Sequence, residues 1–444
     1  MKSVVFLFLL FSSPPCLFAS ETERGTGPAG PEITAPFQST HNSEALLPGE
    51  QNQSKASGDK ATGEGPSHSP KAEAPPSESG RENVPVASYP SNAAATKAVD
   101  KSIWLFTERI KERFSLYLER SGKYIELMRE ILKTYNIPED IAFLPIIESG
   151  FNPEAYSVAR AVGPWQFIAG TAKKYGLKID WWRDERKDPV KSTVAAANYL
   201  RDLYEMFGSW NLAMAAYNAG EGKIYRALSR SKSDNYWALL NTRHIKKETK
   251  EYVPRFIAAK LIASDPRSYG FDNLAYHAPL AYDEVILLKP IDLETAAQCA
   301  ETSLEAIKDL NPEIRRWSTP ANVSSYPLKI PFGKKTVFSE NLLRIPEDER
   351  LSVVRYTVKK GDTVKKIAGK TGFPVSVIAE LNNDSPEFRA GDTILLPPKD
   401  KCRPDRDDRL GSKKAAVKKA KVKKQSTKKI VVTSLDKKKI YAND

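Results

Sequence analysis

Apolar residues recur at helical spacing through the middle of the chain, between residues 98 and 272. Phe106, Ile110, Phe114 and Leu118 follow one another at intervals of four, which predicts one face of an amphipathic helix. We therefore expect an all-α domain over 98–272. Further helices of this domain are expected over 127–135, from Pro138 to Glu148, from the cap Asp188-Pro189 through 194–207, and over 211–217 and 250–264.

Beyond residue 282 the pattern changes to short strand-like runs around pairs of helices, and it repeats with an offset of 71 residues. The offset places Leu293 on Val364 and the pair Leu310-Asn311 on Leu381-Asn382. Each copy ends in an apolar strand closed by Pro. The pattern predicts two related α+β modules of βααβ order, over 283–334 and 353–398.

The first 20 residues are typical of an export signal. The apolar run Val4–Phe11 is too short to span a bilayer, and Ala19 or Ser20 offers a small residue for cleavage. A short N-terminal anchor is the alternative. Cys16 is a candidate for lipid attachment, but Pro15 stands where such a site has a small residue, so we expect Cys16 to be unmodified.

Two further segments lack the large apolar residues that a core needs. Residues 21–97 predict a disordered linker, and residues 403–444 predict a Lys-rich disordered tail. Residues 411–444 hold twelve Lys and two Asp, a net +10 of the +13 on the whole chain. The rest carries only +3 and needs no specific nucleic-acid partner. The tail is either simply solvated, held to anionic envelope polymers or lipids, or an adventitious binder of nucleic acid.

The metal-ligating residue types are few. Cys299 and Cys402 follow the signal, and with the four His of the chain they fit no disulfide framework and no zinc spacing. We therefore expect neither a metal nor a cofactor.

Glu148 is the candidate acid of the helical domain. It ends the apolar run Ile141–Ile147 and stands two residues before Gly150. Desolvation and the negative end of a helix dipole both raise the pKa of a carboxyl in such a place, as a general acid near neutral pH requires. Judged on this context alone, a Glu at a helix end whose carboxylate simply reaches water is the commoner outcome.

Other candidates have equally plain alternatives. Gln166 follows a Gly-Pro-Trp turn and Asn218 precedes Ala219-Gly220, so each amide can hold a polar ligand or merely satisfy its own turn. The acidic residues of 180–188 stand among Arg183, Arg186 and Lys187, where ion pairing is expected. Several aromatic side chains can stack on sugar rings or belong to the core, namely Trp165, Trp181, Trp182, Trp210, Tyr217 and Trp237.

Taken together and in order, these segments resemble the soluble lytic transglycosylase domain of bacterial cell-wall enzymes. The shared motifs include Glu148–Pro153, Ala155-Tyr156-Ser157, Gly163–Phe167, Ala215–Gly220 and Tyr252-Val253. The order of the parts along the chain resembles the membrane-bound lytic murein transglycosylase D family. One departure is Arg160, where many relatives have Gly.

The resemblance implies a lysozyme-like fold with Glu148 as the single catalytic acid/base. It also implies an exported protein of the bacterial periplasm or cell envelope that cleaves the β-1,4 bond between N-acetylmuramic acid and N-acetylglucosamine, giving a 1,6-anhydro product without water. Two alternatives stay open, a hydrolytic muramidase that uses the same Glu148 and a non-catalytic peptidoglycan-binding protein. The residues implied to line or support the glycan subsites are Ser157, Gln166, Tyr217, Asn218 and Tyr252.

The second module resembles LysM domains through Lys360-Gly361-Asp362-Thr363 and Leu381-Asn382. The resemblance implies that Gly361, Asp362 and Thr363 help to bind peptidoglycan glycan strands. The first module lacks the Gly-Asp-Thr opening and resembles a degenerate copy, which leaves its own ligand binding open.

Overall fold

The computed structural model describes residues 90, 92–383 and 387–402. The expected signal over 1–20, nearly all of the expected linker over 21–97 and the expected tail over 403–444 lie outside this range. In the part of the chain that is described, no helix is both long and apolar enough to cross a membrane.

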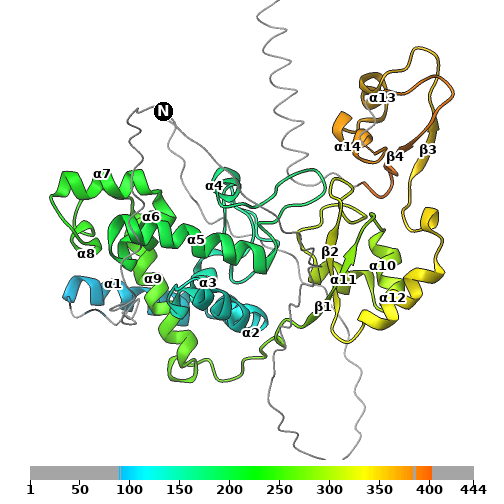
Figure 1. Cartoon of the computed structure of the whole chain (residues 1–444). Coiled ribbons are helices and arrows are strands. Elements are labelled where there is room, and N and C mark those ends of the chain that lie inside the picture. The colour runs from blue at the N-terminus through cyan, green and yellow to red at the C-terminus, as the bar shows by residue number, and fades with distance from the viewer. Residues whose placement is uncertain (1–89, 91, 384–386, 403–444) are drawn as a thin grey trace, which may run out of the picture. The chain divides into compact units, whose positions relative to one another are not determined.

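The first part of the described chain is helical (Figure 1). Its α-helices are α1 Ala93–Trp104, α2 Lys111–Thr134, α3 Leu144–Ser149, α4 Ala169–Lys174, α5 Pro189–Phe207, α6 Trp210–Ala219, α7 Glu221–Ser231, α8 Tyr236–Leu239 and α9 Lys247–Ser264. Helix α1 begins at Ala93, before the expected boundary at 98, because the Asn92 side chain accepts a hydrogen bond from the Ala94 amide at 2.9 Å and so caps the helix.

The helix expected through Phe106 and Leu118 is not continuous. Helix α1 runs into a π-helical turn over Leu105–Arg109, and Ile110 leaves the helical region with φ −128° before α2 begins. The apolar period survives the break because Phe106 and Phe114 stack across it, with ring centroids 4.3 Å apart. After the break, α2 continues from Lys111 to Thr134 and so includes the separate helix expected over 127–135. Periodicity alone therefore could not reveal where the helix stops.

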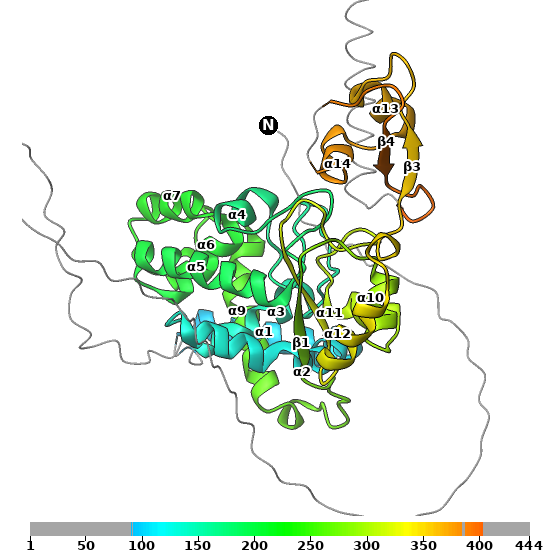
Figure 2. The ribbon, with the colours of Figure 1, turned by 45° about the vertical axis from the view of Figure 1, so that its right-hand side comes forward.

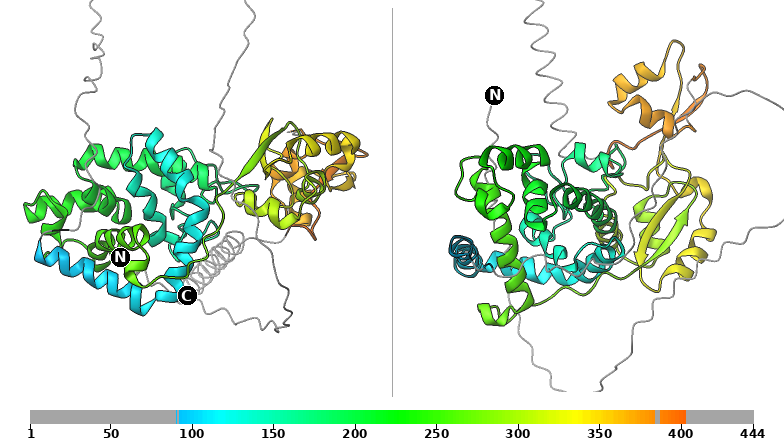
Figure 3. Two further views of the ribbon diagram at one scale, coloured as in Figure 1. Left: turned by 90° about the horizontal axis from the view of Figure 1, so that it is seen from below. Right: turned by 60° about the vertical axis from the view of Figure 1, so that its left-hand side comes forward.

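The core of the helical domain is one cluster of buried side chains in which small residues let helices approach closely. The alanines of α5 and α6, such as Ala196 and Ala215, are fully buried. Helices α1 and α9 pack side by side (Figure 3). The short α3 lies against α2 and α9. The chain after α9 returns along α2, where the Leu280 amide donates to the Lys123 carbonyl at 2.9 Å. The domain thus runs past 272 to about Leu280.

The two modules follow with the expected order of elements (Figure 2). In each, the two strands pair antiparallel as a two-stranded sheet. The first module also includes α12, which lies beyond the expected end at 334, and Phe338 of this helix is buried in the module's core. The elements are β1 Tyr282–Leu287, α10 Leu293–Cys299, α11 Leu304–Leu310, β2 Tyr326–Pro331 and α12 Lys335–Arg344, then β3 Val354–Thr357, α13 Val364–Thr371, α14 Val375–Glu380 and β4 Thr393–Leu396.

The Asn of the repeated Leu-Asn pair has the same structural role in both modules. The Asn311 amide donates to the carbonyls of Ile307 and Lys329, and its Oδ1 accepts from the Lys329 amide. Asn382 makes the equivalent three hydrogen bonds to Ile378 and Leu395. In each module, the Asn side chain therefore ties the end of the second helix to the second strand, which explains why the Asn recurs.

Candidate active site

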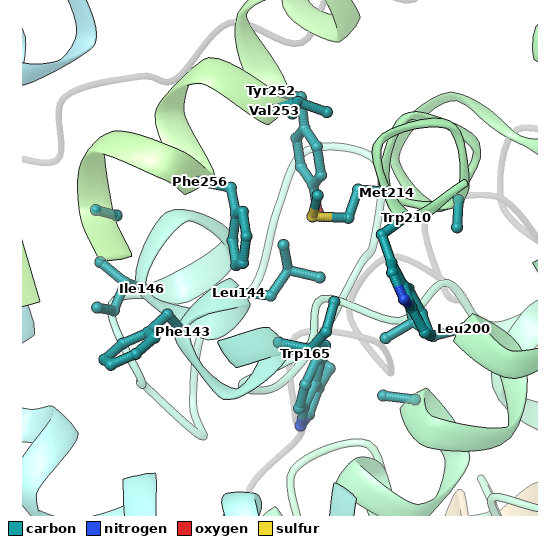
Figure 4. Close-up of a cluster of buried hydrophobic side chains, with 14 of the residues drawn as sticks. Phe143, Leu144, Ile146, Trp165, Leu200, Trp210, Met214, Tyr252, Val253 and Phe256 are labelled. Atoms are coloured by element: carbon teal, nitrogen blue, oxygen red, sulfur yellow. The ribbon is translucent and has the colours of Figure 1, made fainter. Parts of the chain in front are cut away.

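Glu148 lies near the end of α3, among apolar side chains. Phe143, Leu144 and Ile146 precede it and are buried in the core of the helical domain. Figure 4 shows Leu144 within the cluster that includes Phe256 of α9. A helix of six residues is not stable alone, so the position of Glu148 depends on this packing.

Two glycines let the chain pass close to its neighbours on either side of the site. Gly150 ends α3 in the left-handed conformation with φ +60°, and a Cβ there would lie 2.1 Å from the Tyr117 ring. Gly163 has φ +84°, and a Cβ there would lie 1.8 Å from the carbonyl oxygen of Arg186. A side chain at Gly150 would have to displace the Tyr117 ring, and one at Gly163 would have to displace the main chain of Arg186.

The Glu148 carboxyl is paired with a tyrosine from α9. The Tyr252 hydroxyl donates a short hydrogen bond to Glu148 Oε1. The pKa of Glu148 is raised from 4.5 to about 7. Burial is the main cause of the rise, the hydrogen bond from Tyr252 opposes it, and the charge of Glu248 adds to it. The carboxyl can thus give up or take back a proton near neutral pH.

Tyr217 of α6 lies close enough to interact electrostatically with Glu148. Its hydroxyl donates to the Trp165 carbonyl at 2.8 Å, which ties α6 to the Gly163-Pro164 turn. Burial and then the charge of Glu148 raise the pKa of Tyr217 well above 10, and the same two causes act on Tyr252. Both phenols stay protonated beside the carboxyl and act as hydrogen-bond donors.

The other three candidates make local hydrogen bonds. Ser157 Oγ accepts from the Ala161 amide at 3.0 Å, within the 155–167 loop. The Gln166 side chain donates to the Gly163 carbonyl at 2.9 Å in the same loop, as the turn alternative foresaw. Asn218 Oδ1 accepts from the Thr249 hydroxyl at 3.0 Å, which joins α6 to α9. The structure thus pairs Glu148 directly with Tyr252, and places Ser157 and Gln166 together on the 155–167 loop.

Sequence reasoning missed two residues that hold the 155–167 loop. The Ser149 hydroxyl donates to the Pro164 carbonyl at 2.8 Å, which joins the end of α3 to the loop. The buried Arg186 guanidinium donates to the carbonyls of Arg160 and Phe167 at 3.0 and 3.1 Å. The sequence around Arg186 suggested only an ion pair with its acidic neighbours. It could not show the bonds to the loop, because the partners there are main-chain carbonyls.

The remaining candidates separate into core and ion pairs. Trp165 and Trp182 are fully buried, and Trp210 is nearly so, which removes them as stacking surfaces for sugars. The acidic residues of 180–188 are paired as expected, for example Asp184 with Arg186 at 2.7 Å. Asp188 differs from the others because its partner lies outside this segment: it pairs with Lys329 of the first module at 2.7 Å.

In the second module, Asp362 has a structural role. Its carboxylate accepts hydrogen bonds from Lys370 at 2.7 Å and from Tyr356 at 2.7 Å, and these bonds lower the pKa of Asp362 to about 2. Gly361 has φ +83°, and the Thr363 hydroxyl caps α13 through the Lys366 amide. The Gly-Asp-Thr opening therefore builds the turn between β3 and α13.

Comparisons with known proteins match each of the three folded parts. A transglycosylase SLT domain model matches residues 126–240, a model of the LysM-like domain of the lytic transglycosylase MltD matches 281–347, and a LysM domain model matches 356–397. The membrane-bound lytic murein transglycosylase D of Escherichia coli is 30% identical over 321 residues, covering 64% of this chain and 70% of the relative. The chain belongs to the membrane-bound lytic murein transglycosylase D family.

The protein is thus a peptidoglycan lytic transglycosylase with a lysozyme-like helical domain and LysM modules. A more distant relative is the membrane-bound lytic murein transglycosylase C of Haemophilus ducreyi, 25% identical over 166 residues, or 32% of this chain and 45% of the relative. Among solved structures, the 70 kDa soluble lytic transglycosylase of Escherichia coli is 22% identical with a TM-score of 0.30, covering 41% of this chain and 32% of that chain.

The raised pKa of Glu148 predicts how stability depends on pH. The folded protein holds this proton more tightly than the unfolded chain does. The stability that the protonated Glu148 contributes is therefore fully present below pH 4.5 and is lost as the pH rises through about 7. Glu148→Gln removes the ionisation. We expect its unfolding free energy relative to the wild type to rise by about 2–3 kcal/mol between pH 4 and pH 8, measured by urea unfolding.

Glu130→Gln, on the exposed face of α2, is the matched control for this measurement. The same difference at both pH values for Glu148→Gln would contradict the desolvation of the carboxyl.

Proposed function

We propose that Glu148 acts first as the acid and then as the base in non-hydrolytic cleavage of the bond between N-acetylmuramic acid and N-acetylglucosamine. The observation that carries the proposal is a carboxyl at the end of an apolar helix, held by the Tyr252 hydroxyl, with a pKa of about 7. Near neutral pH such a group is populated in both the protonated and the ionised form, and both steps need it.

In the first step the protonated Glu148 gives its proton to the glycosidic oxygen, and the bond from that oxygen to C1 of the muramyl sugar breaks. In the second step the carboxylate takes the proton of the muramyl 6-hydroxyl, whose oxygen forms a bond to C1. The bond between the two sugars breaks, and a bond from the 6-oxygen to C1 forms within the muramyl sugar. The net result for the proton is a transfer from the 6-oxygen to the leaving oxygen, and no water is consumed. The product carries a 1,6-anhydro ring.

This scheme uses one carboxyl, whereas most glycoside hydrolases use two. We assign the stabilisation of the charge at C1 to the substrate's own N-acetyl group, positioned by Ser157, Asn218 and Tyr252. The bond from Thr249 to Asn218 Oδ1 supports this role, because it fixes the amide and directs its NH₂ group as a donor. Gln166 and Tyr217 support the same subsites by shaping the 155–167 loop.

The rest of the chain fits an exported enzyme of the bacterial cell envelope. Its E. coli relative is described as a membrane-bound murein transglycosylase. The proposed plan is a signal over 1–20 with unmodified Cys16, a linker that ends before α1, a catalytic domain from Ala93 to about Leu280, a degenerate module from Tyr282 to the end of α12 at Arg344, and a LysM domain over 353–398. Gly361, Asp362 and Thr363 would build the turn that meets glycan. An intact mass of the mature protein tests the signal cleavage and the state of Cys16.

The product of the reaction is the main test. Digestion of purified murein should yield anhydromuramyl ends by mass spectrometry, and Glu148→Gln should lower their rate of formation at least a thousandfold, since acid/base catalysis is worth about 10²–10⁴ for each role. Reducing ends alone would instead identify a hydrolytic muramidase. Wild-type clearance of murein by Glu148→Gln would contradict the assignment of the acid.

Removing the hydrogen bond from Tyr252 should shift the pH profile. The bond favours the ionised carboxylate, so Tyr252→Phe raises the pKa of Glu148 further. We expect the alkaline limb of kcat/KM, which reports loss of the acid form, to move upward by about one pH unit. Tyr225→Phe on the exposed face of α7 is the control. An unchanged or downward-shifted limb would mean that Tyr252 does not act on the acid.

The Lys-rich tail over 403–444 is proposed to hold the enzyme to anionic envelope polymers or lipids. Pelleting with envelope fragments should weaken when residues 411–444 are removed, and should weaken with added salt only in the full chain. Equal pelleting of both chains at every salt concentration would leave the tail without this role.

A further inference from the structure

The two βααβ modules differ between their second helix and second strand. In the second module Asn382 bonds to Leu395, which is 13 residues further along the chain. In the first module the equivalent Asn311 bonds to Lys329, which is 18 residues further along. The first module therefore carries five more residues between the same two landmarks. Its longer connection includes the segment 313–316, which lies against the catalytic domain.

The main chains of this segment and of the catalytic domain pair directly. Arg183 and Ile314 face each other in an antiparallel bridge. The Asp184 amide donates to the Glu313 carbonyl at 2.8 Å. Three further hydrogen bonds lie beside the bridge, from the Arg315 amide to the Trp182 carbonyl (2.8 Å), from the Arg315 guanidinium to the Asp180 carbonyl (2.6 Å) and from the Arg316 guanidinium to the Trp181 carbonyl (2.8 Å).

A buried ion pair fastens the second strand of the module to the same place. Lys329 Nζ lies 2.7 Å from Asp188 Oδ2 and 3.9 Å from Glu313 Oε1. Asp188 is fully buried, and its other oxygen caps α5 through the Val190 amide at 2.8 Å. Tyr326 donates to Glu313 at 2.8 Å. Buried charged groups thus fix the module to the N-terminus of α5 in the catalytic domain.

The junction continues into the loop beside the catalytic acid. Asp184, whose amide binds the module, holds the Arg186 guanidinium with both carboxylate oxygens, at 2.9 and 2.7 Å. Arg186 in turn holds the carbonyls of Arg160 and Phe167, and its own carbonyl lies where a side chain at Gly163 would be. These contacts form an unbroken chain of hydrogen bonds from the module to the 155–167 loop.

We propose that the first module is a positioning element of the catalytic domain, which holds the 155–167 loop in the conformation that receives the glycan. The inference rests on the proposed roles of Ser157 and Gln166 in the glycan subsites. It gives the module a function that does not require binding to the wall. It also explains why a copy that lacks the Gly-Asp-Thr opening is kept in the chain.

The test uses the full chain and short soluble murein glycans, which do not require attachment to the insoluble wall. Lys329→Met leaves Asp188 and Glu313 without their cation and should loosen the junction. We expect KM for the soluble glycan to rise about tenfold, with kcat changed less than threefold, because the loop binds substrate while Glu148 stays on α3. Lys308→Met, an exposed lysine of the same module, should behave as the wild type.

A second substitution separates positioning from general loss of structure. Asp188→Asn and Glu313→Gln, added together to Lys329→Met, remove both unpaired buried charges, and an Asn side chain still caps α5. This triple variant should restore KM to within about threefold of the wild type. If Lys329→Met does not fold, Arg315→Ala, which removes the donor to the Asp180 carbonyl, should still raise KM several-fold.

Wild-type KM in Lys329→Met and in Arg315→Ala would overturn the proposal. A second result would also overturn it. In the Glu148→Gln background, Lys329→Met would weaken binding to insoluble murein by a larger factor than the factor by which it raises KM, as expected if the module binds the wall. Failure of the proposed function would differ from both, because the wild type itself would form no anhydromuramyl ends.

Discussion

The desolvation of the Glu148 carboxyl is the constraint on which the catalytic domain depends. Water would return the pKa of this group to its ordinary value, so the chemistry requires an apolar wall that does not open. That wall is built from parts that are far apart in sequence: α3 itself, α2 behind it and Tyr252 of α9 across from it. Because α3 has only six residues, its neighbours fix its position more than its own hydrogen bonds do.

The sequence predicted the local half of this arrangement. Apolar periodicity indicated most of the long helices, and the run before Glu148 indicated a raised pKa, which the structure also shows. The break at Ile110 was missed because no Gly or Pro marks it and the apolar period continues across it. Helices α4, α7 and α8 were missed as well. Local pattern describes which face of a segment is buried, but not where its backbone changes course.

The nonlocal half could not be predicted from single positions. Tyr252 is 104 residues from Glu148, and nothing in its own neighbourhood distinguishes it from a core tyrosine. Gln166 and Asn218 were selected for their amides, yet the hydrogen bonds they make are largely structural. Arg160 shows what the departure from Gly means: it has φ +64°, a left-handed conformation that an arginine adopts at a cost. The Arg186 guanidinium binds the Arg160 carbonyl, and the Arg160 amide donates to the Ser157 carbonyl, so both ends of this residue are held.

The same reasoning applies to the buried charges between the catalytic domain and the first module. Two carboxylates share one ammonium there, and burial together with the charge of Asp188 raises the pKa of Glu313. A buried ion pair contributes little net stability, because the loss of hydration offsets most of the attraction. What it does enforce is a single geometry, since any displacement leaves a charge without a partner in a place that water cannot reach. A junction of this kind is poorly suited to a flexible tether between independent domains and well suited to holding a loop at a fixed distance from a catalytic acid.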